Sequence, residues 1–181
     1  STTKYLGGHS DLLGGAVISR PDNPFFDRVR NIQHLAGAVP SPHDCWMLQR
    51  SIHTLSCRME MHCSNAQKVA EYLAGHKKVE KVFYPGLKDS PYYQVSKKQS
   101  RNFGGMLSFL YRGSEAEAQK VVSQSKVITP ATSLGGVEST WEHRRSSEGL
   151  NSPTPGNLIR FSVGLEHPDD LLADLEQALN I

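Results

Sequence analysis

The stretch STTKYLGGHSD, residues 1–11, opens the chain and holds its most informative side chains. Lys4 stands among hydroxyl residues, with Ser1 and Thr3 on the same side of it in the sequence, and two glycines follow. Hydroxyl groups can hold a phosphate and a lysine amine can condense with an aldehyde, so these residues together could bind a phosphorylated aldehyde. A lysine in a loop of this kind is more often an ordinary surface residue. The residues alone leave both interpretations open.

Two helices are expected next along the chain. Asn23-Pro24 offers a cap and a first-turn proline for a short helix. A stronger signal begins at Ser41, after which apolar residues recur at spacings of three and four until Gly75, a natural stop. We therefore expect one long helix over residues 41–75, long enough to leave one domain and enter the next, and a domain boundary near Gly75.

Beyond Gly75 the pattern mixes strands and helices. Ser114 and Glu117 form a capping box that opens one helix, and Pro168 begins a final one. Alternation in the last predicted strand places Arg160 opposite its apolar side chains. Strands are predicted over residues 79–84, 105–111 and 158–163. This order indicates a small α+β layer with helices packed on a sheet.

Composition excludes several classes of protein. The 181 residues are 38% hydrophobic and 21% charged, which is ordinary for a globular protein with a real core. The formal charge is only +2, from 20 basic and 18 acidic residues, and the basic residues that are adjacent form only short, separate pairs. This pattern argues against nucleic acid as a partner. No apolar run approaches the ~20 residues that a membrane span needs.

Three cysteines, Cys45, Cys57 and Cys63, form no CxxC pair, and an odd number argues against a complete disulfide framework. We expect buried thiols on a helix and a reducing, cytoplasmic compartment. No metal site is expected, because no histidine pair has zinc-ligand spacing beside the cysteines. The chain opens at Ser1 without an initiator methionine, so we expect it to be part of a longer protein.

The opening eleven residues strongly resemble the S-x-T-K-Y-x-x-G-H-S-D cofactor signature of the Cys/Met metabolism (trans-sulfuration) family of pyridoxal-phosphate enzymes. That family includes cystathionine γ-synthase, cystathionine γ-lyase, methionine γ-lyase and O-acylhomoserine sulfhydrylases. Further segments similar to the family reach to the end of the chain: YPGL at 84–87, FGGMLSF at 103–109, SLGGVES at 133–139 and NLIRFSVGLE at 157–166. RSIHTL at 50–55 and SPY at 90–92 depart from the family's common forms, which puts the subfamily in doubt.

The resemblance implies an α/β protein with the PLP-dependent transferase fold type I. Residues 1–75 would be the end of the cofactor-binding large domain with a long connecting helix, and residues 76–181 the small C-terminal α+β domain. The rest of the active site would lie upstream of Lys4 and on a neighbouring subunit. The expected partners are therefore the missing N-terminal half, self-association as a dimer or a dimer of dimers (a homotetramer), and an amino-acid substrate.

Residue by residue, the resemblance assigns the Schiff base with pyridoxal 5'-phosphate to Lys4 and phosphate contacts to Ser1 and Thr3. Ser133 and Arg160 take the positions that receive the substrate α-carboxylate, a role that suits the planar fork of arginine. Without the resemblance, Arg160 is more easily interpreted as part of a surface ion pair and Ser133 as a turn residue.

Three further residues complete the expected site. Glu138 takes a position near the distal end of the substrate, where charge biases which amino acid is accepted. His9 and Asp11 are expected to brace the loop rather than to transfer protons.

The function implied is γ-elimination or γ-replacement on cystathionine- or O-acylhomoserine-type substrates, as in cystathionine γ-synthase or γ-lyase. An O-acylhomoserine sulfhydrylase or a methionine γ-lyase is the alternative within the family. An alternative from another class is a non-catalytic interaction module derived from this fold.

Overall fold

The computed structural model describes residues 1–149 and 151–181, and it divides into two compact units, Ser1–Leu55 and Ser56–Ile181. We call them the N-terminal unit and the C-terminal unit. Their boundary does not coincide with Gly75, because the helix that ends at Gly75 packs its apolar face into the core of the C-terminal unit. The domain layout of 1–75 and 76–181 concerns the complete protein and stays a prediction.

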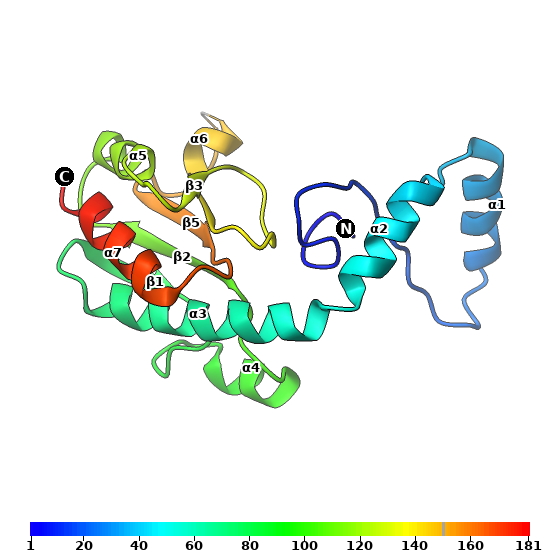
Figure 1. Ribbon diagram of the computed structural model, residues 1–181, viewed down its shortest axis with the longest axis horizontal. Coiled ribbons are helices and arrows are strands. Elements are labelled where there is room, and N and C mark those ends of the chain that lie inside the picture. The colour runs from blue at the N-terminus through cyan, green and yellow to red at the C-terminus, as the bar shows by residue number, and fades with distance from the viewer. Residues whose placement is uncertain (150) are drawn as a thin grey trace. The chain divides into compact units, whose positions relative to one another are not determined.

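The N-terminal unit begins with turns and continues with α1 (Phe26–Ala36) and α2 (Pro42–Ile52) (Figure 1). Asn23 accepts a hydrogen bond from the backbone N–H of Phe25 at 3.0 Å, just ahead of α1. Ser41 caps α2 as predicted, because its hydroxyl accepts the N–H of Asp44 at 3.1 Å. α1 buries none of its residues, although it carries a regular apolar stripe.

The predicted long helix is two helices. α2 ends at Ile52 and α3 (Leu55–Gly75) begins after a turn at His53 and Thr54. Both the N–H and the hydroxyl of Thr54 donate to the carbonyl of Ser51, at 3.2 and 3.1 Å. These bonds reach back three residues instead of four, so they tighten the chain and interrupt the α-helical ladder. A side chain that competes for backbone acceptors has overridden the apolar periodicity.

The C-terminal unit is built on a mixed five-stranded sheet in the order β1-β2-β5-β4-β3. All neighbouring pairs are antiparallel except β3 and β4. The strands are β1 (Val79–Phe83), β2 (Met106–Tyr111), β3 (Thr129–Pro130), β4 (Thr140–His143) and β5 (Leu158–Ser162). The helices after α3 are α4 (Tyr93–Gln99), α5 (Glu115–Ser123), α6 (Arg144–Glu148) and α7 (Pro168–Leu179). The predicted strands at β1, β2 and β5, the capping box of α5 and the final helix are confirmed.

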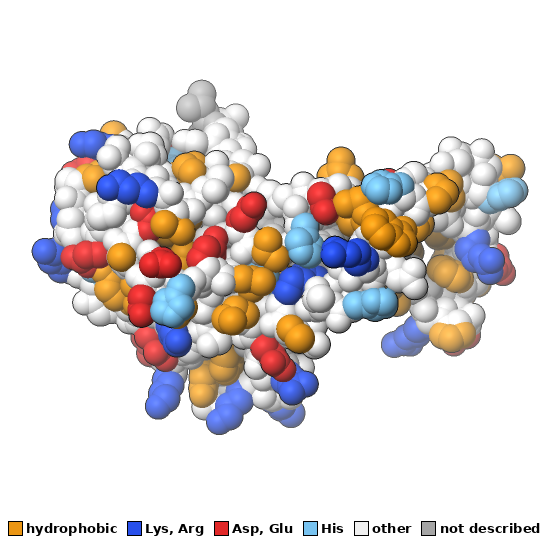
Figure 2. Space-filling view, viewed as in Figure 1, with side chains coloured by type: hydrophobic (Ala, Val, Ile, Leu, Met, Phe, Trp, Pro, Cys, Tyr) orange, Lys and Arg blue, Asp and Glu red, His pale blue; other side chains and the backbone are white. Residues whose placement is uncertain are grey.

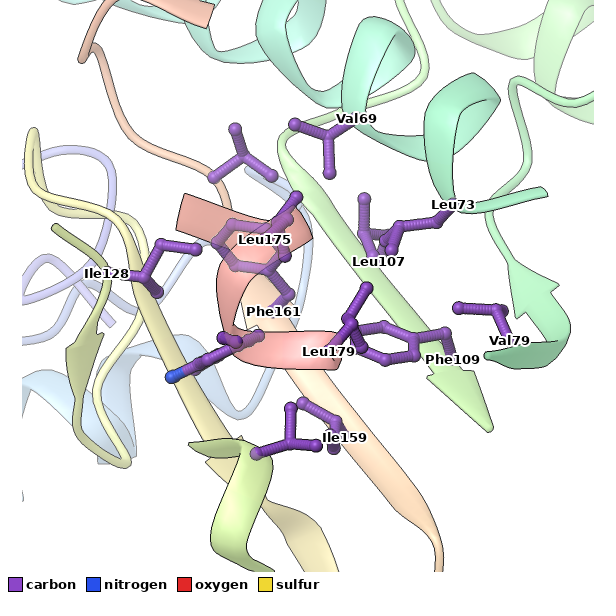
Figure 3. Packing of buried hydrophobic residues seen from close by; sticks show 14 of the residues in the cluster. Val69, Leu73, Val79, Leu107, Phe109, Ile128, Ile159, Phe161, Leu175 and Leu179 are labelled. Carbon is purple, nitrogen blue, oxygen red and sulfur yellow. The ribbon is translucent and has the colours of Figure 1, made fainter. Parts of the chain in front are cut away.

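The core lies between one face of this sheet and the helices α3, α5 and α7. Figure 3 shows Val69 and Leu73 of α3 close to Leu107 of β2. Leu175 and Leu179 of α7 complete this layer in the same view. The strands alternate in burial, so the side chains between these core positions point to the other face of the sheet. That second face is only partly buried and carries the predicted Arg160; we call its part around Arg160, Ser108 and Glu142 the polar face.

Candidate active site

The segment around Lys4 is a compact turn. The N–H of Gly7 donates to the carbonyl of Thr2 at 2.7 Å, and the N–H of Gly8 donates to the carbonyl of Lys4 at 2.7 Å. Thr2 is buried and Lys4 is half-buried. The backbone on both sides of the lysine is therefore held by hydrogen bonds, which leaves its amine as the long, movable group of the turn.

The start of the turn is also fixed to Gly14. The N–H of Thr2 donates to the carbonyl of Gly14 at 2.9 Å, and the hydroxyl of Thr3 accepts the N–H of Gly14 at 3.0 Å. A Cβ atom at Gly14 would lie 2.5 Å from the hydroxyl oxygen of Thr2, so the close approach requires glycine here. Because Thr3 uses its oxygen as an acceptor, its hydroxyl proton remains available to donate to an anion.

His9 and Asp11 follow the turn and are exposed. A ring nitrogen of His9, Nδ1, lies 2.9 Å from the carbonyl oxygen of Gly7. Ser10 has a positive φ of 57°, which is uncommon for a residue other than glycine. The contact made by His9 supports the prediction that it braces the loop.

Arg160 lies on the polar face of the sheet in the C-terminal unit. Its cross-strand partners are Ser108 on β2 and Glu142 on β4, so the three side chains form a row on one face. Nη2 of Arg160 lies 2.6 Å from Oε1 of Glu142 and donates to the carbonyl of Thr132 at 2.5 Å. The side chain retains 22% exposure, so it lies at the edge of solvent with its orientation fixed.

Ser133 is brought to the same face by its backbone. Its carbonyl accepts the hydroxyl of Thr140 at 3.0 Å, and the N–H of Gly135 donates to the hydroxyl of Ser162 at 2.9 Å. The carbonyl of Thr132 also accepts a hydrogen bond from Arg160. Together these three bonds attach the loop over residues 132–135 to β4 and β5. The structure therefore places the loop that carries Ser133 beside Arg160, which binds the adjacent residue Thr132.

Glu138 lies further along the same loop and is exposed. Its neighbour Ser139 is buried and donates to Glu166 through both its N–H, at 2.6 Å, and its hydroxyl, at 2.7 Å. The hydroxyl of Ser139 also accepts the N–H of Gly164 at 2.7 Å. These bonds fix the backbone at Glu138, but within residues 1–149 and 151–181 its carboxylate makes no hydrogen bond or ion pair, so the structure does not join it to Ser133 and Arg160.

Sequence reasoning missed Glu142. Its side chain is only 5% exposed, and Oε1 accepts from Arg144 at 2.9 Å as well as from Arg160. Hydrogen bonds to Glu142 and Glu148 raise the pKa of Arg144, and bonds from Ser152, Thr154 and Arg144 lower the pKa of Glu148 to about 2. The available signal was the alternation around Trp141, which places its acidic neighbour on the face of the sheet that also carries Arg160.

Helix α3 also contributes contacts that the sequence did not reveal. A ring nitrogen of His62, Nδ1, lies 2.7 Å from the carbonyl of Val163, and Asn65 donates to the carbonyls of Gly164 and Glu166 at 3.1 and 2.9 Å. Burial lowers the pKa of His62, against the effect of its bond to Val163. α3 therefore holds the end of β5 immediately after Arg160.

All three cysteines are free, but Cys45 and Cys57 are exposed and Cys63 is half-buried, so the expectation of buried thiols was wrong. No group of three metal-binding side chains occurs among the described residues. In the part of the chain that the structure describes, none of the helices combines the length and apolarity that a membrane span requires.

The predicted residues thus form two sets. Ser1, Thr3 and Lys4 lie in one segment of the N-terminal unit, while Arg160 and the loop that carries Ser133 lie side by side in the C-terminal unit. The first set offers two hydroxyls and an amine, which fits a cofactor with a phosphate and an aldehyde. The second offers a fixed guanidinium, which fits a carboxylate.

Comparison with known proteins places the whole chain. Residues 1–180 match the family model described as Cys/Met metabolism PLP-dependent enzyme. The chain is 46% identical over 185 residues to cystathionine gamma-synthase of Mycobacterium leprae, covering 99% of this chain and 47% of that protein. It is 41% identical over 188 residues to cystathionine beta-lyase of Coxiella burnetii, covering 99% of this chain and 48% of the relative.

A solved structure agrees with these relatives. Cystathionine gamma synthase from Xanthomonas oryzae pv. oryzae, in complex with cystathionine, superposes with a TM-score of 0.92 at 37% identity, over 99% of this chain and 48% of that one. The chain spans about half the length of the relatives that it matches. With the signature around Lys4 and a family match over almost every residue, the chain belongs to the Cys/Met metabolism family of PLP-dependent enzymes.

Proposed function

We propose that the complete protein catalyses γ-elimination or γ-replacement on cystathionine- or O-acylhomoserine-type substrates, with pyridoxal 5'-phosphate as cofactor. The observation that carries the proposal is the hydrogen-bonded turn that carries Thr3 and Lys4, directly after Ser1, in a chain 46% identical to a cystathionine gamma-synthase. A non-catalytic module would not require this combination of side chains.

Lys4 has two tasks in this proposal. Its amine binds the cofactor covalently, and once released by the substrate amine it carries protons from the substrate carbon atoms. Pyridoxal phosphate, when bound, supplies the electron sink that makes those protons acidic. The bonds from Gly7 to Thr2 and from Gly8 to Lys4 keep the lysine backbone in place while the side chain moves between these tasks.

Ser1 and Thr3 bind the cofactor phosphate. The hydroxyl oxygen of Thr3 already accepts the N–H of Gly14, so its proton is directed away from that backbone group and is available to a phosphate oxygen. This assignment gives the tight approach between Thr2 and Gly14 a purpose: it sets the direction in which the neighbouring hydroxyl can donate.

Arg160 and Ser133 bind the substrate α-carboxylate, and Glu138 influences the distal end of the substrate. The ion pair to Glu142 and the bond to Thr132 fix the guanidinium of Arg160, which suits a residue that orients a ligand. The carboxylate of Glu138 is exposed, which is consistent with a residue that meets a variable part of the substrate.

The remaining partners are the N-terminal half of the enzyme and further copies of the chain, as a dimer or a dimer of dimers. The exposed apolar side chains of the N-terminal unit support this, since Leu35 is 85% exposed and Ile18 is 93% exposed. The free thiols at Cys45, Cys57 and Cys63 support a reducing, cytoplasmic location.

Lys4→Ala in the complete protein tests the proposal. It should abolish the absorbance near ~420 nm expected of the lysine-bound cofactor, together with turnover, because no other amine takes its place. Lys98→Ala, on the exposed surface of α4, is the matched control and should retain both. A Lys4→Ala protein that keeps the band and the activity would contradict the assignment.

Separate assays with cystathionine, O-acylhomoserine, methionine and cysteine then define the reaction. We expect the largest kcat/KM with cystathionine or an O-acylhomoserine. Preference for methionine would instead indicate a methionine γ-lyase. No turnover of any of the four, with no cofactor band, would favour the non-catalytic module.

A further inference from the structure

Glu142 lies where it can control the orientation of Arg160. The two residues are directly opposite each other on the antiparallel strands β4 and β5, and their side chains point to the polar face of the sheet. Oε1 of Glu142 lies 2.6 Å from Nη2 of Arg160. A carboxylate that is only 5% exposed needs charged partners to offset its lost hydration, so this contact is strong and persistent.

Glu142 is itself held on its other side. Oε1 also accepts from Nη1 of Arg144 at 2.9 Å, and Oε2 accepts the hydroxyl of Ser147 at 2.7 Å. Arg144 and Ser147 both belong to α6, so the carboxylate is clamped between that helix and β5. A carboxylate fixed in this way can orient the guanidinium that it contacts. A mobile carboxylate would instead move with the guanidinium.

The contacts of Arg160 divide its five N–H donors into two groups. Glu142 and the carbonyl of Thr132 both bind Nη2. Among the residues that the structure describes, Nε and Nη1 make no hydrogen bond, which leaves three N–H groups for a ligand. The anchored nitrogen sets the plane of the guanidinium, and the free ones define where a carboxylate can bind.

We propose that Glu142 is a positioning residue that holds Arg160 so that its free N–H groups meet the substrate α-carboxylate. This inference rests on the proposed function, which makes Arg160 the carboxylate ligand. It goes beyond that function, because it assigns the geometry of the carboxylate site to a residue that does not touch the substrate. Arg144 and Ser147 belong to the same support.

Two effects of removing Glu142 have opposite signs. Loss of its negative charge would leave Arg160 more attractive to an anion and would lower KM. Loss of the anchor would let the guanidinium rotate away and would raise KM. We expect the second effect to be larger, because a partly exposed carboxylate site is screened by solvent while the anchoring bond is buried.

The experiment uses the complete holoenzyme with Glu142→Leu and Glu142→Gln. Leucine removes both charge and acceptor and should raise the KM of the amino-acid substrate about ten-fold with kcat within about two-fold. Glutamine keeps an acceptor and should raise KM by about three-fold. Glu115→Gln is the control, since it removes a carboxylate whose ion pair is with Arg145 and not with Arg144 or Arg160, and it should leave KM unchanged.

The same substitutions in an Arg160→Ala background separate positioning from a general structural effect. A residue that acts through Arg160 has nothing left to position, so Glu142→Leu should no longer change KM there. An undiminished ten-fold effect in that background would overturn the inference, as would an unchanged or lower KM in both single variants. If Glu142→Leu does not fold, as judged by thermal melting, Glu142→Gln in the two backgrounds carries the test.

Failure of this inference is distinguishable from failure of the proposed function. If Arg160→Ala alone leaves KM unchanged, Arg160 does not bind the carboxylate, and this inference is overturned together with that role of Arg160, while the proposed function itself is tested by Lys4→Ala. If Arg160→Ala raises KM strongly while neither Glu142 variant does, the role of Arg160 stands and only its positioning by Glu142 is overturned.

Discussion

The two units of this chain differ in how many apolar side chains they bury within themselves. Between Ser1 and Leu55, Leu12 is the one apolar side chain that is buried, and α1 buries none of its residues. Between Ser56 and Ile181, three helices and a sheet enclose a continuous core. Figure 2 shows apolar side chains at the surface over α2, while acidic and basic side chains are interspersed over the C-terminal unit. The comparison teaches that Lys4 lies on a unit with almost no core of its own, whereas Arg160 lies on a scaffold with an internal core.

The largest effect is expected when the units are separated. Residues 56–181 alone should unfold cooperatively on heating, because their core is internal, and residues 1–55 alone should show no cooperative transition. Circular dichroism measures both. Tryptophan fluorescence gives a second readout, since Trp141 is 1% exposed and Trp46 is 59% exposed. A cooperative melt of the 1–55 fragment would break the comparison.

Truncating one buried and one exposed leucine tests the same difference between the two units. Leu171→Ala in α7 should lower the free energy of unfolding by about 2–5 kcal/mol, because Leu171 is fully buried. Leu35→Ala in α1 makes the same chemical change at an 85% exposed position and should change it by less than about 0.5 kcal/mol. Urea titration of residues 1–181 provides both values. Equal losses would show that α1 is buried in solution.

Acid should affect the C-terminal unit through Asp174. Burial raises the pKa of this carboxyl, but N–H groups of Ile128, Lys126 and Val127 donate to it and the net effect lowers its pKa below 3.8. A lowered folded-state pKa adds stability that is present above pH 3.8 and is lost as pH falls through the folded value.

Asp174→Asn should therefore cost about 2 kcal/mol near neutral pH and reduce the loss of stability below pH 3.8. The measurement is the urea midpoint as a function of pH. Asp170→Asn, at an exposed position in the same helix, is the control. Identical acid profiles for the wild type and Asp174→Asn would contradict the explanation.

The smallest effect compares two helix caps. Ser114 closes a capping box with Glu117 at the start of α5. Ser114→Ala should therefore lower the free energy of the main unfolding transition by about 1 kcal/mol. Ser41 caps α2 in the N-terminal unit, and Ser41→Ala should leave that transition unchanged, since the transition reports the core of the other unit. A shift of equal size from Ser41→Ala would mean that the two units unfold together.

Sequence patterns correctly predicted the elements that have a regular apolar spacing or a cap motif. The alternation that places Ile159 and Phe161 opposite Arg160, and the capping box at Ser114, are both present in the structure. They failed where the structure depends on the hydrogen bonds of a single residue or on a strand too short to show a period. Thr54 interrupts the expected long helix through hydrogen bonds to Ser51, and β3 is too short to leave a signal.

The candidate site divides in the same way. Resemblance to a family proposes Lys4, Ser133 and Arg160 because motifs record residues that meet ligands. It does not propose Glu142 or Glu166, whose importance comes from the partners that folding brings to them across strands and loops. Such supporting residues become visible only when registers and distances are known.

The close approach at Gly164 constrains how this site can change. A Cβ atom there would lie 2.4 Å from the carbonyl oxygen of Val137 and 2.5 Å from the backbone nitrogen of Ser139. Since backbone atoms cannot yield as a flexible side chain does, every larger residue would displace the segment that carries Ser133 and Glu138. Any attempt to transplant that segment into a relative must therefore carry this glycine along, or the graft will be misaligned.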